Sequence, residues 1–90
     1  MYKITFAPKA KEGLVKLKES EPSSFNKAVK LLDEISVHPK TGTGHPEQLK
    51  GEPSNRWSRH ISKKHRLVYR IFKTEVYVYV LSAYGHYDNK

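Results

Sequence analysis

Four side chains that could together cut RNA stand at separate points of the sequence. Glu47 is an isolated acid in a basic segment, Arg66 opens an apolar run, and His86 and Tyr87 are adjacent. A glutamate kept ionised by nearby lysines and histidines can accept a proton from a ribose 2′-hydroxyl. Histidine titrates near neutral pH, so His86 could protonate a departing 5′ oxygen. Arginine can stabilise the charge that grows on a phosphate, so this set could cleave RNA without a metal.

Each of these residues also has an ordinary structural interpretation. A lone glutamate outside a helix is usually solvated, and Arg66 could be a charge that keeps a strand end soluble. His86 could be a surface histidine, and Tyr87 could pack on the sheet edge rather than stack on a base or bind the scissile phosphate. Arg59 lies on the neighbouring predicted strand, and we expect it to converge with Arg66 on one patch. Two converging arginines favour a phosphate site.

The remaining histidines do not suggest a metal site. The five histidines stand at positions 38, 45, 60, 65 and 86, and only His60 and His65, across a turn, are close in sequence. None has a second ligand at helical spacing, so we interpret His60 and His65 as surface residues and expect no metal. The sequence also has no glycine-rich phosphate loop and no serine elbow, and we expect no cofactor.

Composition indicates one small basic domain. The 90 residues carry a net charge of +8, and all four arginines lie in the second half of the chain. A basic domain suggests an acidic partner, which could be nucleic acid, an acidic protein or a membrane surface, although a merely solubilising surface is the alternative. The position of the arginines favours nucleic acid. The sequence has no cysteine, and no apolar run is long enough for a signal peptide or a membrane span, so we expect a cytoplasmic protein.

Hydrophobic periodicity predicts one strand and two helices in the first half. Apolar residues alternate over residues 2–6, as in a half-buried strand. Pro8 suits the first turn of a helix, in which Gly13 is expected to cost about 1 kcal/mol relative to alanine. The second helix ends before Pro39. Its predicted apolar stripe consists of Phe25, Ala28, Val29, Leu32 and Ile35.

The second half changes to the alternating period of strands. Strands are predicted over residues 56–62, 67–72 and 76–84, and a short one is possible over 47–50. The predicted fold class is α+β, with two N-terminal helices packed on one face of a mostly antiparallel four- to five-stranded sheet. The other face is left for a partner or substrate. We expect a single domain over residues 1–87 and a short tail over 88–90.

Four short motifs occur together in an order that resembles a known family. They are Pro46-Glu47-Gln48-Leu49-Lys50, Trp57-Ser58-Arg59-His60-Ile61, His65-Arg66-Leu67-Val68-Tyr69 and His86-Tyr87. Each is weak alone, but the four in register resemble the Txe/YoeB branch of the RelE toxin superfamily. The first half matches this branch only in its pattern of a strand followed by two helices.

The resemblance implies the toxin of a type II toxin–antitoxin pair, a ribosome-dependent endoribonuclease that cuts mRNA in the A site. The 2′-hydroxyl would attack its own 3′ phosphate, leaving a cyclic or 3′ phosphate and a free 5′-hydroxyl. By position, the resemblance makes Glu47 the general base and His86 the general acid. It gives transition-state stabilisation to Arg66 and substrate positioning to Tyr87.

The resemblance also carries binding roles and partners. Lys50 and Arg59 would be phosphate contacts, and mRNA, the ribosome and a cognate acidic antitoxin would be the partners. A homodimer is left open, and no membrane is implied. Two other classes remain as alternatives: a non-catalytic basic RNA-binding protein, which would not explain Glu47 with His86, and a ParE-like topoisomerase poison on the same fold, which would not need this set of residues.

Overall fold

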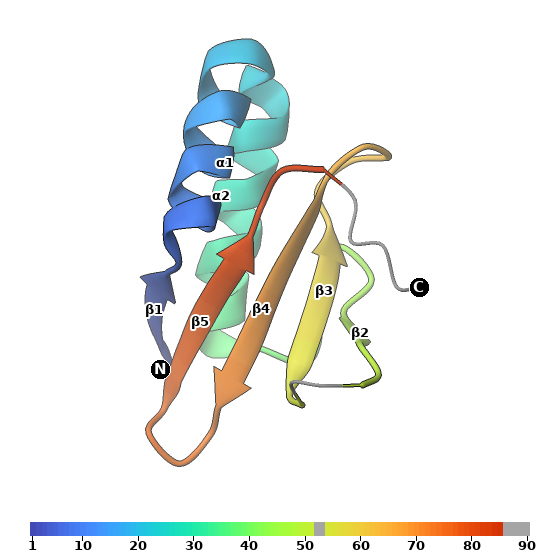
Figure 1. Ribbon diagram of the computed structural model, residues 1–90. Helices are drawn as coiled ribbons and strands as arrows, with labels where there is room; N and C mark the ends of the chain where they lie inside the picture. The colour runs from blue at the N-terminus through green and yellow to red at the C-terminus, as the bar shows by residue number, and fades with distance from the viewer. Residues whose placement is uncertain (52–53, 86–90) are drawn as a thin grey trace.

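The computed structural model describes residues 1–51 and 54–85, which form two helices and five strands (Figure 1). In chain order these are β1 (Lys3–Phe6), α1 (Pro8–Ser20), α2 (Pro22–Val37), β2 (Glu47–Gln48), β3 (Arg56–His60), β4 (Arg66–Phe72) and β5 (Tyr77–Ser82). The predicted order of strand, two helices and strands is confirmed. Residues 86–90 lie outside the described residues, so the domain boundary at residue 87 stays a prediction.

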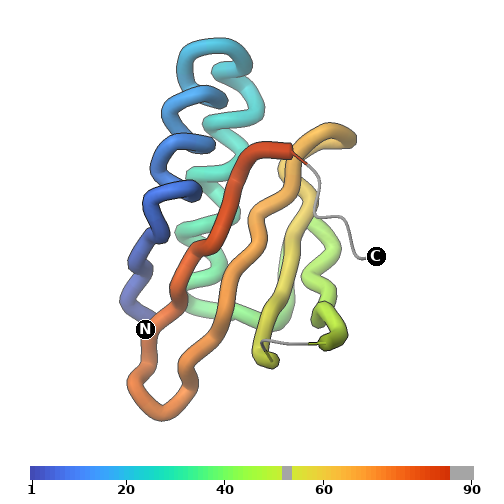
Figure 2. Tube along the Cα trace, viewed as in Figure 1, coloured from blue at the N-terminus to red at the C-terminus, as the bar shows by residue number. Residues whose placement is uncertain are grey.

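The five strands form one mixed sheet in the order β1-β5-β4-β3-β2. Strands β2 to β5 pair antiparallel, whereas β1 pairs parallel to β5, with Lys3 opposite Tyr77. The first strand therefore lies beside the last one (Figure 2), and the two helices carry the chain from β1 at one edge of the sheet to β2 at the other. The predicted α+β class, with both helices on one face of a mostly antiparallel sheet, is confirmed.

The core lies between the helix pair and one face of the sheet. Its fully or nearly fully buried members include Ala10, Leu17, Ala28, Leu31, Ile35, Leu67, Tyr69, Ile71, Val78 and Val80. Burial of each large apolar side chain contributes roughly 1.5–3 kcal/mol. No helix within residues 1–51 and 54–85 is long and apolar enough to cross a membrane.

The second helix differs from its prediction in two details. It begins at Pro22, which occupies the first helical turn, so the single residue Glu21 separates it from α1, where the sequence predicted a longer break over residues 20–24. Its buried positions are Ala28, Leu31 and Ile35, whereas Val29, predicted in the stripe, is 40% exposed. The helix is rotated so that the 28, 31, 35 row faces the sheet.

Gly13 has a packing role that the sequence did not indicate. A Cβ atom at this position would lie 2.9 Å from Cβ and 3.1 Å from the backbone nitrogen of Tyr84. Only a glycine lets α1 approach the chain that follows β5 this closely. The glycine that weakens α1 as an isolated helix thus brings α1 against the segment after β5.

Candidate active site

The pairing of strands places Glu47 and Arg66 on the face of the sheet that points away from the helices. Glu47 is opposite Ser58, which is opposite Val68, while His60 is opposite Arg66. Side chains two residues apart on a strand share a face, so all of these residues point to the side opposite the core. From standard strand spacings, the Cα atoms of Glu47 and Arg66 are about 12 Å apart across β3. That separation leaves room for one nucleotide linkage between the two side chains.

Glu47 is exposed at the edge of the sheet, on the two-residue strand β2. The imidazole rings of His45 and His60 pack edge to face with centroids 6.0 Å apart, and both residues line the same hollow as Glu47. Backbone hydrogen bonds hold β2 at both ends: His60 N–H donates to Gly44 O (2.7 Å), and Leu49 N–H donates to Arg56 O (2.8 Å). The carboxylate is therefore presented to solvent from a fixed backbone, beside two imidazoles.

Arg66 is half-buried, and its guanidinium is not neutralised by an acid within the part of the chain that the structure describes. Its Nε atom is buried without a hydrogen-bond partner there, and so is the Oγ atom of Ser58 on the adjacent strand. Buried polar atoms normally have partners. Within the described residues, these two buried polar atoms on the Glu47 face therefore have unused hydrogen-bonding capacity.

The described chain ends beside Arg66. The Arg66 N–H donates to Gly85 O at 3.1 Å, so the residue before His86 is fixed to the first residue of β4. His86 and Tyr87, the predicted general acid and positioning tyrosine, lie outside the described residues. Glu47 and Arg66 thus share one face, and the placement of His86 and Tyr87 stays a prediction.

Arg59 has a different environment from the one predicted. Its side chain is 0% exposed, and Leu67, its partner on β4, belongs to the core, so Arg59 and Arg66 point to opposite faces. Its guanidinium donates to oxygen atoms of the protein: Glu34 Oε1 (2.6 Å), His38 O (2.6 Å), Thr41 O (2.8 Å), Thr43 O (3.3 Å) and Tyr69 Oη (3.1 Å). The predicted convergence with Arg66 is wrong, and burial contradicts the predicted phosphate contact of Arg59. Arg59 instead anchors the loop that leads to β2.

The electrostatics of this anchor follow from its hydrogen bonds. The backbone N–H of Thr43 donates to the Glu34 carboxylate at 2.6 Å and, together with the nearby Arg59 charge, holds the pKa of Glu34 below its usual range. Burial raises the pKa of the Tyr69 phenol, which donates to Pro39 O at 2.8 Å. Arg59 on β3 and Tyr69 on β4 therefore hold loop 38–44 on the helix side of the sheet. This fixes the position at which the chain enters β2, and with it the position of Glu47.

His65 was predicted to be a surface histidine, and this is wrong. It is 3% exposed, with one ring nitrogen bonded to Glu21 and the other to the backbone of Gly85. Lysines precede it in a polar turn, so no local signal indicates burial. The signal lies in distant residues, because Glu21 joins the two helices and Gly85 follows β5.

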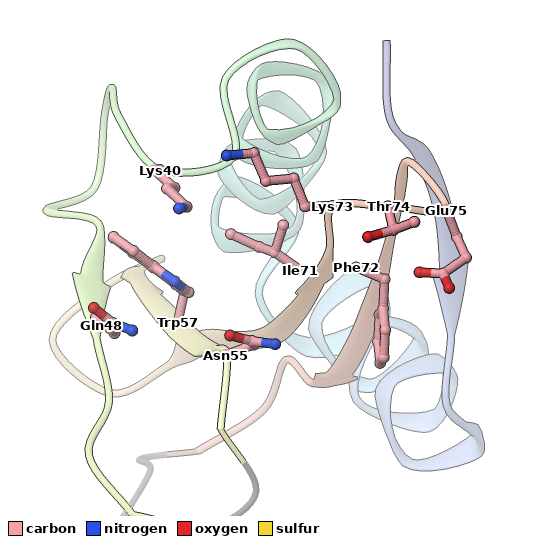
Figure 3. A pocket seen from close by; sticks show the side chains of 9 residues that line it. All are labelled: Lys40, Gln48, Asn55, Trp57, Ile71, Phe72, Lys73, Thr74 and Glu75. Atoms are coloured by element: carbon pink, nitrogen blue, oxygen red, sulfur yellow. The ribbon is translucent and has the colours of Figure 1, made fainter.

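A pocket of about 250 Å³ lies at the opposite end of β3 and β4 from Arg66 (Figure 3). Trp57 and Ile71 form its apolar part, and Lys40 and Lys73 stand at its rim. Trp57, predicted as core, packs against the core and also lines this pocket. Of the predicted site residues that the structure describes, none lines it. Since Trp57 pairs with Gln48 and Tyr69, its side chain lies on the helix side of the sheet, away from the Glu47 face.

Two helices on one face of a five-stranded sheet are the fold of YoeB- and RelE-type toxins of known structure. The family described as "YoeB-like toxin of bacterial type II toxin-antitoxin system" matches residues 6–87, so the chain belongs to the YoeB-like toxins. The resemblance drawn from the four sequence motifs is confirmed.

Individual relatives agree with this assignment over nearly the full chain. Toxin YoeB of Mycobacterium bovis is 38% identical over 87 residues, which cover 97% of this chain and 100% of that protein. A YoeB dimer from Staphylococcus aureus superposes with a TM-score of 0.84 at 31% identity, covering 96% of this chain and 98% of the other. The YoeB-YefM complex from the same organism gives a TM-score of 0.81 at 31% identity, covering 97% and 99%.

Proposed function

We propose that this toxin is a ribosome-dependent endoribonuclease that cleaves mRNA in the A site by metal-independent acid–base chemistry. The observation that supports the proposal is the arrangement of Glu47 and Arg66. An exposed carboxylate and a guanidinium without an acidic partner among the described residues share the face of the sheet opposite the helices, with their Cα atoms about 12 Å apart by standard strand spacings.

In the proposed reaction, Glu47 takes the proton of a ribose 2′-hydroxyl, and the 2′ oxygen attacks the adjacent phosphorus. Arg66 stabilises the negative charge that grows on the phosphoryl oxygens. The bond to the 5′ oxygen breaks as His86 donates a proton to it, and Tyr87 positions the substrate. The products are a 2′,3′-cyclic phosphate and a free 5′-hydroxyl.

The proposed RNA contacts are those whose side chains can reach solvent. Lys50 is exposed two residues after the end of β2 and remains a proposed phosphate contact. Arg59 is not included, because its guanidinium is fully occupied within the protein.

The proposed partners are the mRNA, the ribosome and an acidic antitoxin, with the cytoplasm as the place of action. The S. aureus relative has been solved both with YefM and as a dimer. By analogy, we propose that an antitoxin neutralises this chain, and a homodimer is compatible with the same comparison.

The test is cleavage of mRNA on intact ribosomes, with analysis of the product ends. We expect 5′-hydroxyl ends, and we expect Glu47→Gln and His86→Gln each to reduce cleavage about 10²–10⁴-fold, the usual contribution of a general acid or base. Glu75→Gln is the matched control, because Glu75 is an exposed acid on the β4–β5 turn.

Products with 5′-phosphate ends would identify a different nuclease mechanism. Full cleavage by the Glu47→Gln variant would remove Glu47 from the mechanism. Binding of ribosomes without any cleavage would favour the RNA-binding alternative.

A further inference from the structure

The imidazole of His65 connects three segments that are far apart in the sequence. His65 stands directly before β4, and its ring is buried. Its Nε2 atom lies 2.8 Å from Oε2 of Glu21, the single residue between α1 and α2. Its Nδ1 atom accepts a hydrogen bond from the backbone N–H of Gly85 at 2.9 Å.

These contacts determine which tautomer of the ring satisfies both hydrogen bonds. A backbone N–H can only donate, so Nδ1 must offer a lone pair to Gly85. The ring proton is then on Nε2, where it is donated to the Glu21 carboxylate. This bond lowers the pKa of Glu21, and the carboxylate in turn holds the ring in the orientation that presents Nδ1 to Gly85.

The segment before residue 86 is held from other sides as well. Ala83 is fully buried, and Tyr84 packs against α1 at Gly13 and against the His65 ring, with ring centroids 4.6 Å apart. The carbonyl of Gly85 accepts from Arg66 N–H. Both polar groups of the Gly85 backbone are therefore bonded to the dipeptide His65-Arg66.

We propose that His65 is a positioning residue for the cleavage reaction, because it fixes the backbone from which His86 follows and sets it beside Arg66. The role of His86 as general acid rests on the proposed function above. His65 itself touches no substrate, because both of its ring nitrogens are engaged within the protein.

Two substitutions separate the two bonds of the ring. In His65→Asn, the amide oxygen can stand where Nδ1 stood and still accept from Gly85. In His65→Gln, the terminal amide can stand where Nε2 stood and still donate to Glu21, but nothing accepts from Gly85. Each variant keeps one of the two hydrogen bonds of the ring: His65→Asn keeps the bond to Gly85, and His65→Gln keeps the bond to Glu21. The Asn variant therefore serves as the matched control for the Gln variant.

The first measurement uses no RNA. Amide hydrogen exchange at Gly85, in a Glu47→Gln background that avoids toxicity, should be about tenfold faster in His65→Gln than in the parent and little changed in His65→Asn. Exchange at the core residues Val78 and Val80 should be unchanged in both variants. This separates loss of the hydrogen bond between His65 and Gly85, called the tether below, from general unfolding.

The second measurement is cleavage on programmed ribosomes. His65→Gln should lower kcat about tenfold with little change in KM, whereas His65→Asn should keep most of kcat. Equal Gly85 exchange in all three proteins would overturn the tether. Faster exchange with unchanged kcat would overturn the positioning role. If the parent protein does not cleave mRNA, the proposed function is contradicted, and so is the role of His65 in cleavage. The hydrogen bond between His65 and Gly85 would not be contradicted by that result.

The parent protein provides a test that does not depend on folding of the variants. At neutral pH, the ¹⁵N shifts of the His65 ring should identify the tautomer with the proton on Nε2 and a lone pair on Nδ1. A proton on Nδ1 would be incompatible with the Gly85 bond and would overturn the proposal.

Discussion

Arg59 and Arg66 are on neighbouring strands, but their surroundings give them opposite tasks. Arg59 uses its planar fork to satisfy the carbonyls of a loop, with Glu34 as counter-charge. Arg66 keeps a buried Nε atom without a partner in residues 1–51 and 54–85. The first arginine is structural, and the second is the one to which the proposed function gives a role in cleavage.

Substitution should separate these tasks. Arg59→Leu leaves buried carbonyl oxygens and the Glu34 carboxylate without their donor, and we expect it to lower the free energy of unfolding by about 3 kcal/mol. Urea unfolding measures this. Arg66→Leu is the control: its free energy of unfolding should change by less than about 1 kcal/mol while cleavage is lost. A stable Arg59→Leu variant with weakened RNA binding would contradict the structural role.

The residue-level predictions succeeded where the sequence neighbourhood decides the outcome and failed where distant partners do. The edge position and exposure of Glu47 follow from the short run between two loops. The burial of Arg59 requires Glu34 on α2, and the burial of His65 requires Glu21 and Gly85. The sequence of an alternating strand does not show whether a charged side chain faces the core or solvent. Its burial can be predicted only when its partner in the distant part of the chain is known.

At the scale of elements, α1 and the chain after β5 meet through the absence of a side chain at Gly13. Helix propensity and packing therefore make opposite demands on this position. Propensity alone predicts that alanine would stabilise α1 by about 1 kcal/mol. The distance of 2.9 Å to Tyr84 Cβ predicts a clash that neither backbone can easily relieve.

We expect packing to dominate, so that Gly13→Ala destabilises the protein by about 1–3 kcal/mol despite the better helix former. Thermal or urea unfolding measures the effect. Glu12→Ala, one position away and exposed, is the control for propensity without a clash. An increase in stability for Gly13→Ala would show that α1 is not held against Tyr84.

The loop that joins α2 to β2 should respond to acid. The folded-state pKa of Glu34 is lowered, chiefly by the Thr43 N–H, so its contribution to stability is present above the ordinary glutamate pKa and is lost as pH falls through the lowered value. Stability should therefore decrease between about pH 5 and pH 3. Urea unfolding at several pH values should show a shallower decrease for Glu34→Gln. An unchanged slope would assign the acid sensitivity to other groups, such as Glu21.

The arrangement of elements was largely predictable, and the pairing of β1 was not. Alternation and helical periodicity are local, so they placed the two helices and the later strands, to within a few residues at their ends. That β1 pairs parallel to β5 depends on the helix pair folding back across the sheet, which no local pattern reports.

At the scale of the whole molecule, a charge of +8 should govern how partners approach. If the proposed acidic antitoxin is the partner, attraction between opposite charges accelerates association, and salt screens it. We expect the association rate constant to fall at least tenfold between about 50 and 500 mM NaCl, with a smaller change in the dissociation rate. Stopped-flow mixing measures both. An association rate independent of salt would indicate that charge does not guide the encounter.

The neighbouring positions of β1 and β5 also have a consequence for folding during translation. Translation makes Lys3–Phe6 first among the strands and Tyr77–Ser82 last, so β1 has no partner during most of synthesis. The sheet closes, and Gly85 reaches Arg66, only after residues 77–85 have emerged. The nascent chain therefore cannot complete its sheet until β5 is available to pair with both β1 and β4.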